Sequence, residues 1–140
     1  MKRSLSIFIA AATLALGSAP VFATMVYSTF GANFAADSSG GWVVGPSGPY
    51  DYALGMIFTP NSSAYVDQID LAVNGTGPAT VSLYTANSDS PGSLLQSWSV
   101  QPVAASSAYP NPIVSITSNI NVYLSSGTAY MLEVSGSSDV

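Results

Sequence analysis

Residues 80–85, with the sequence TVSLYT, alternate their side chains with a period of two. In an extended chain Val81 and Leu83 fall on one face, while Ser82 and Tyr84 fall on the other. A period of two is typical of a strand with one dry face and one solvated face. The stretch therefore predicts a strand of an antiparallel sheet.

The same pattern recurs along the chain, and no stretch beyond residue 23 sustains the 3.6-residue period of an amphipathic helix. Clusters of Gly, Pro, Ser and Asn, as at 45–49, 74–78 and 87–92, separate the alternating stretches and carry turn chemistry. Eight short strands at regular spacing predict one all-β domain, an antiparallel β-sandwich that resembles a jelly roll. The expected strands are Val26–Phe30, Trp42–Val44, Tyr52–Phe58, Tyr65–Val73, Thr80–Thr85, Leu94–Val100, Ile113–Ser118 and Thr128–Val134.

Two further expectations concern the later strands. Leu94, Trp98 and Val100 are spaced to share one inward face, so Trp98 is predicted to pack in the core. The sequence ends at Val140, soon after the last expected strand, and a sandwich needs a partner for each edge. We therefore expect one or more final strands to lie beyond this sequence.

The first 23 residues have the pattern of a secretory signal peptide. Lys2 and Arg3 precede an apolar run over residues 5–16, and Val21-Phe22-Ala23 places small residues before the expected cleavage between Ala23 and Thr24. The domain is then expected to span residues 24–140, exported to the cell surface or the extracellular matrix. The apolar run is shorter than the roughly 20 residues that span a bilayer.

The expected mature chain has no Lys, Arg, His or Cys, and removal of the signal peptide lowers the formal net charge from −5 to −7. An acidic surface without cations disfavours nucleic acid and anionic membranes. Nucleophilic catalysis with a histidine base is excluded, as are zinc, copper and iron sites built on His or Cys. The sequence predicts no enzyme, and its charge suits cations, neutral glycans or basic partners.

Carboxylates leave two kinds of site open. A glycosidase needs a pair of acids, but Asp67 and Asp70 are three apart on one expected strand and would point to opposite faces. Asp51 with Asp70 is not constrained by the sequence. Calcium needs only oxygen ligands, and Asn87 and Asp89 could supply some of them, although a turn explains both residues without a metal. We therefore predict no cofactor, with calcium as the alternative.

Aromatic side chains provide a third kind of site, because exposed Trp and Tyr rings can stack on sugars. Trp42 follows two glycines and is the best candidate for such a platform, with Tyr50 and Tyr52 close by in sequence. The opposing interpretation is that these rings fill half-buried positions of the sheet. The other aromatic residues considered are Tyr84, Tyr109 and Tyr123.

A set of strand-and-turn phrases, in this order, resembles bacterial exported proteins with a "choice-of-anchor" domain of type R: Tyr27–Gly31, Gly41-Trp42, Phe58–Pro60, Gln68–Ala72, Val81–Thr85, Pro91–Leu95 and Gly127–Tyr130. Many such proteins carry a PEP-CTERM sorting signal at their carboxyl end. The resemblance implies a jelly-roll-like sandwich, retained at the envelope or released into an exopolysaccharide matrix. It brings no catalytic residues, and no sorting tail is present by Val140.

Together these observations predict an exported, non-enzymatic structural or interaction module of the cell envelope or exopolysaccharide matrix. The alternative is a carbohydrate-binding module, assisted by calcium in one version, with Trp42, Tyr50 and Tyr52 as its platform. A glycosidase with a carboxylate pair ranks last.

Overall fold

A computed structural model describes residues 44–47, 50–75, 77–104 and 112–136. These residues form nine strands and no helix, which confirms the all-β prediction, and none of their segments is a helix that could cross a membrane. The strands are β1 (Gly45–Ser47), β2 (Tyr50–Phe58), β3 (Ala64–Tyr65), β4 (Ile69–Ala72), β5 (Ala79–Asn87), β6 (Ser90–Val100), β7 (Ile113–Ile116), β8 (Tyr123–Leu124) and β9 (Tyr130–Gly136).

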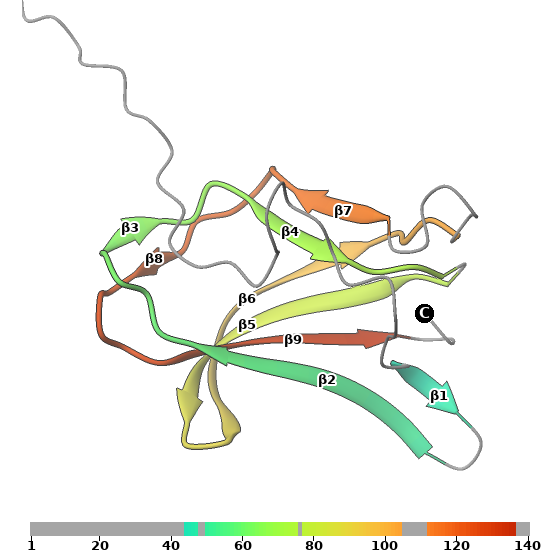
Figure 1. The fold of residues 1–140 in the computed structure, drawn as a ribbon, viewed down its shortest axis with the longest axis horizontal. Helices are drawn as coiled ribbons and strands as arrows, with labels where there is room; N and C mark the ends of the chain where they lie inside the picture. The colour runs from blue at the N-terminus through green and yellow to red at the C-terminus, as the bar shows by residue number, and fades with distance from the viewer. Residues whose placement is uncertain (1–43, 48–49, 76, 105–111, 137–140) are drawn as a thin grey trace, which may run out of the picture.

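Five strands form one antiparallel sheet in the order β1-β2-β9-β5-β6. The long strand β9 lies between β2 and β5, which are not neighbours of β9 in sequence (Figure 1). Its residue Leu132 is opposite Met56 on one side and Leu83 on the other, so a row of apolar side chains crosses three strands on one face.

The remaining strands form an arm, by which we mean residues 64–72 together with residues 113–124. In the arm β3 pairs with β8 and β4 pairs with β7, and both pairings are antiparallel. The ladder is interrupted at residues 66–68, where Val66 N donates to Val122 O at 2.9 Å. The strand expected over Tyr65–Val73 is thus two short strands. Asp67 lies in the break, so the strand spacing that separated it from Asp70 does not apply.

The arm lies across one face of the five-stranded sheet, called here the inner face, in a sandwich-like arrangement (Figure 1). Buried side chains from both layers form a single core, because each layer presents its apolar side to the other. The core residues are Val44, Ala79, Val81, Leu83, Trp98, Ile116, Val122, Leu124, Tyr130, Leu132 and Val134. The burial of Val81, Leu83 and Trp98 confirms the inward face predicted for these positions.

The prediction for Leu94 is wrong. Between Val100 and Gln96 strand β6 runs in regular register with β5, but the register shifts between Leu83 and Tyr84 and shifts again before Ala86. Each shift inserts one extra β6 residue, as in a β-bulge. A shift of one residue moves the following side chains to the other face, and Leu94 is 55% exposed as a result.

Two expected turns are shorter than predicted. Ser90–Gly92 belong to β6, and only Ser88 and Asp89 connect β5 to β6. Ser88 has a φ of 54°, the positive value that the first central position of a type II′ hairpin turn requires. Near the start of the described chain, Gly45–Ser47 form strand β1 instead of a turn and pair with the first residues of β2.

Candidate functional site

The predicted aromatic platform is only partly within the described chain. Trp42 and the expected strand Val26–Phe30 lie outside the described residues. Tyr50 begins β2 opposite Ser47, and Tyr52 lies opposite Gly45 with 46% of its surface exposed. Tyr52 is therefore a surface aromatic residue. It lies near the start of β2, and this end of the strand is far from β3 and β8 (Figure 1).

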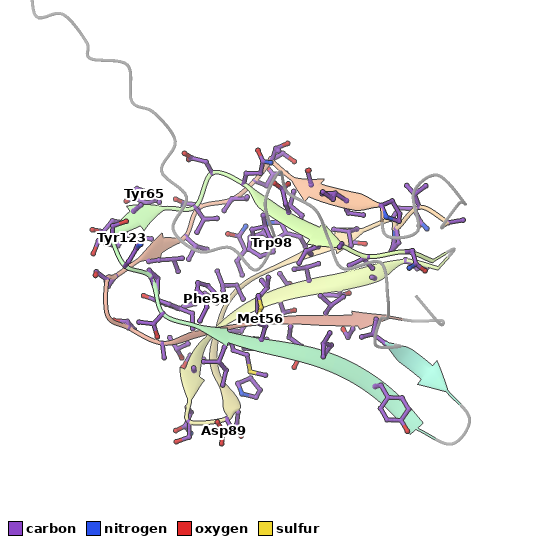
Figure 2. The ribbon with its side chains drawn as sticks, in the orientation of Figure 1. Met56, Phe58, Tyr65, Asp89, Trp98 and Tyr123 are labelled. Atoms are coloured by element: carbon purple, nitrogen blue, oxygen red, sulfur yellow. The ribbon has the colours of Figure 1, made fainter. Side chains whose placement is uncertain are left out.

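A different pair of aromatic side chains is exposed on the arm. Tyr65 on β3 and Tyr123 on β8 lie directly opposite each other, and they are 64% and 52% exposed. Their ring centroids are 5.1 Å apart with an interplanar angle of 65°, an edge-to-face arrangement (Figure 2). Such a geometry suits the ring quadrupoles, so each ring helps to orient the other. Both rings of this pair, called here the tyrosine pair, are more exposed than the ring of Tyr52.

The tyrosines face outward because their neighbours face inward. Leu124 is almost completely buried in the core, and Ala64 opposite it is half-buried. Since successive side chains of a strand alternate between faces, Tyr65 and Tyr123 must point away from the sheet. Burial of the adjacent leucine thus fixes the orientation of the tyrosine pair.

Hydrogen bonds support the two short strands on the side that leads to β9. Ser126 N donates to Ser63 Oγ at 2.8 Å, and Ser126 Oγ donates to Asn61 O at 3.1 Å. The buried Tyr130 hydroxyl accepts from Ser125 N at 2.9 Å, and its ring lies 6.0 Å from that of Phe58. A ladder of two residue pairs has little stability alone, so these contacts hold the tyrosine pair in place.

Beyond the break in the ladder, the same outward face of the arm carries a polar cluster. Asp70 lies opposite Ser115, and its carboxylate accepts a hydrogen bond from Ser115 Oγ at 2.6 Å. Gln68 Nε2 donates to both Asp70 oxygens, at 2.8 and 2.7 Å. These neutral donors hydrogen-bond the Asp70 carboxylate and orient it, while its charge remains. The outer face of the arm therefore combines exposed rings with hydrogen-bonding groups.

A cleft with a volume of about 600 Å³ separates the edge of the sheet from the arm. Its walls are residues 96–101 and residues 114–119, and neither wall contains a charged residue. One end is bridged by Asn119, whose carbonyl accepts from Gln96 Nε2 and, at 3.4 Å, from Trp98 Nε1. Asn119 has a φ of 56°, a left-handed conformation that Asn tolerates better than most residues.

The acidic residues of the described chain do not gather into a metal site. Asn87 is the last residue of β5, and Asp89 belongs to the two-residue turn that follows it and is exposed at the tip (Figure 2). Within residues 44–47, 50–75, 77–104 and 112–136, no three Asp or Glu side chains lie close enough together to hold a metal ion. The hairpin turn accounts for both residues of the alternative calcium site.

Comparison with known protein families, with curated proteins and with solved structures finds no match for this chain. The function must therefore be argued from the surfaces described above. Sequence analysis considered Tyr123 among the aromatic residues but overlooked Tyr65. The signal that could have found the pair is the alternation of Val122, Tyr123 and Leu124, in which the ring lies between two core residues.

Proposed function

We propose that this chain is an exported, non-enzymatic interaction module of the cell envelope or exopolysaccharide matrix, and that it binds neutral polysaccharide at the tyrosine pair. The observation that carries the proposal is the exposure of two rings held edge-to-face on the outer surface of the arm. A tyrosine ring offers an apolar face and a hydroxyl, so it can pack on a sugar ring and hydrogen-bond its substituents.

Preorganisation favours binding at this site. A tyrosine side chain has only two side-chain torsions, and each ring here is already restrained by the other. Little conformational entropy is lost when such a surface meets a ligand. The nearby cluster of Gln68, Asp70 and Ser115 extends the same face with groups that can bond hydroxyls.

The charge of the chain restricts the ligand. The expected mature chain contains seven acidic residues and no basic ones, so an acidic polysaccharide would be repelled. A neutral polysaccharide meets no such barrier. The lack of His, Cys and Lys in the same segment leaves no ordinary general base or nucleophile near neutral pH, which supports binding without turnover.

Affinity electrophoresis in gels containing soluble neutral polysaccharides (β-glucan, xyloglucan and galactomannan) tests the proposal, with alginate as the acidic comparison. At least one neutral gel is expected to retard the wild-type chain, whereas alginate is not. Tyr65→Ala and Tyr123→Ala are each expected to weaken binding about tenfold, which corresponds to about 1.4 kcal/mol.

Tyr52→Ala is the matched control, because it removes an exposed tyrosine at the other end of the molecule. It is expected to bind like the wild type. Tyr123→Phe keeps the ring and is expected to retain most of the affinity. The proposal is wrong if no neutral polysaccharide retards the chain, or if Tyr52→Ala weakens binding as much as Tyr65→Ala does.

A further inference from the structure

Strand β6 forms an open edge of the five-stranded sheet. It pairs with β5 on one side, and no other strand of the described chain pairs with it on the other side. A cleft lies between this edge and residues 114–119, and Asn119, beyond the end of β7, bridges it by accepting from Gln96 and Trp98. An edge strand presents a row of backbone N–H and C=O groups to which another strand can pair.

Proteins usually protect such edges with proline, charge or bulges, and β6 is protected only in its first half. Pro91 and both register shifts lie between the hairpin turn and Gln96. From Gln96 to Val100 the strand is regular and contains no proline, no charge and no bulge. This five-residue stretch is therefore available as a template for strand pairing.

Charge indicates which kind of partner can approach this edge. All seven charged residues of the expected mature chain are acidic, so two copies repel each other over most of their surfaces. Residues 90–132, however, contain no charged residue, and they include β6, β7 and β8. The open edge of β6 therefore lies within the part of the chain where two copies can meet without opposing carboxylates.

The β6 edge can pair in antiparallel orientation with the same edge of a second copy. In the stretch Gln96-Ser97-Trp98-Ser99-Val100, an antiparallel pairing centred on Trp98 places Ser97 of one copy opposite Ser99 of the other. This register keeps both serines on the exposed outer face and Trp98 on the buried inner face. Hydroxyl side chains opposite each other are favourable cross-strand pairs.

We propose that two copies of this chain associate through their β6 edges, in antiparallel register about Trp98, to form one continuous sheet. The interface consists mainly of backbone hydrogen bonds, so the association is concentration-dependent and weak on the scale of obligate dimers. Each pair of copies carries two tyrosine pairs, which would raise the avidity for a repeating polymer. The association itself does not depend on the proposed polysaccharide site.

Sedimentation velocity of the purified full chain, without polysaccharide, tests the association. Protein concentrations of about 10 μM to 1 mM cover the dissociation constants expected of such an edge. Self-association is expected in this range, and Ser97→Glu/Ser99→Glu should raise the dissociation constant at least tenfold. The matched control is Ala53→Glu/Thr80→Glu, which adds the same charge to exposed positions on the same outer face of β2 and β5, the two strands that flank β9. The control should change the constant less than twofold.

Cysteine pairing tests the register independently, since the chain has no cysteine of its own. In a glutathione redox buffer, a mixture of Ser97→Cys and Ser99→Cys copies should form a disulfide-linked dimer, because opposed Cα atoms in antiparallel strands are about 4.5–5.5 Å apart. Each variant alone should link much more slowly, because its two cysteines are then offset along the edge. Thr80→Cys, on the interior strand β5, should not link.

Three results would overturn the proposal: a chain that stays monomeric at every concentration, association that survives Ser97→Glu/Ser99→Glu, or equal linking by the mixture and by Ser97→Cys alone. Far-UV circular dichroism of each variant identifies loss of fold. The cysteine experiment decides the question if the glutamate variant does not fold. Failure here would leave the Tyr65 and Tyr123 experiments unaffected, because those residues lie on other strands.

Discussion

Replacing Trp98 with alanine is expected to lower the free energy of unfolding by about 3–5 kcal/mol. Trp98 lies on β6 opposite Val81, which is completely buried, and it faces the arm that carries Ile116. Only 9% of its surface is exposed, so the indole joins the sheet to the arm (Figure 2).

Two contributions make up the expected loss of unfolding free energy for Trp98→Ala: the burial of the indole and one hydrogen bond. A buried indole removes about 150–250 Å² from water. At about 25 cal/mol per Å² the upper limit of the loss is about 4–6 kcal/mol, before partial collapse of the cavity reduces it. The bond from Trp98 Nε1 to Asn119 O is long, at 3.4 Å, and adds at most about 1 kcal/mol. Trp98→Phe keeps most of the apolar contact and should cost about 1–2 kcal/mol.

Urea unfolding followed by far-UV circular dichroism measures these losses, with Leu94→Ala as the control on the same strand. Sequence spacing places Leu94 and Trp98 on one face, but the bulge exposes Leu94, so its truncation should cost no more than about 0.5 kcal/mol. Equal losses for the two variants, or a loss below about 1 kcal/mol for Trp98→Ala, would refute the packing of the arm on the sheet.

Three glycine substitutions test other contacts by the same unfolding assay. Gly92→Ala places a methyl group 2.8 Å from the backbone oxygen of Thr85, which cannot move away easily, and should cost about 1–3 kcal/mol; a neutral result would contradict the bulge geometry. Gly55→Ala collides only with the flexible end of Met131, so its cost, about 1 kcal/mol, should disappear in a Met131→Ala background. A side chain at Gly127 meets no atom within 4 Å, but the residue has a φ of +77°. Gly127→Ala should therefore lower the free energy of unfolding by about 1 kcal/mol, and Gly127→Asn by less. Equal losses for the two variants would argue against the backbone strain.

Alternation alone predicts the face of a strand only while the register is regular. Val81 and Leu83 lie on β5 next to β9, and both were placed correctly because nothing interrupts that ladder. Leu94 was placed wrongly because one extra residue in β6, between Gln96 and Leu94, reverses its face. A bulge depends on the pairing of two strands, so the sequence of β6 by itself contains little sign of it.

Turn composition located the connections but not their ends. The run from Asn87 to Gly92 contains Asn, Ser, Asp, Pro and Gly, which all favour turns, yet only Ser88 and Asp89 form the turn. Pro91 is tolerated in β6 because an edge strand has one side without a partner. Pairing with β5 thus brings Ser90–Gly92 into β6, although their composition predicted a turn.

The candidate site was the least predictable feature. Proximity in sequence favoured Trp42, Tyr50 and Tyr52, whereas the exposed pair joins two tyrosines that are 58 positions apart, Tyr65 and Tyr123. Each belongs to a strand of two residues, and the alternation around Tyr123 gives no sign that Tyr65 lies opposite it. Only the pairing of β3 with β8 brings the two rings together.

The most direct test of polysaccharide binding at the tyrosine pair is a map of the residues that a bound ligand perturbs. Amide chemical shifts can be recorded while an oligosaccharide of the most strongly retarding polysaccharide is added. The account predicts the largest changes at Ala64, Tyr65, Tyr123 and Leu124, and saturation at the affinity measured by electrophoresis. Changes confined to the β6–β7 cleft or to the start of β2 would contradict it.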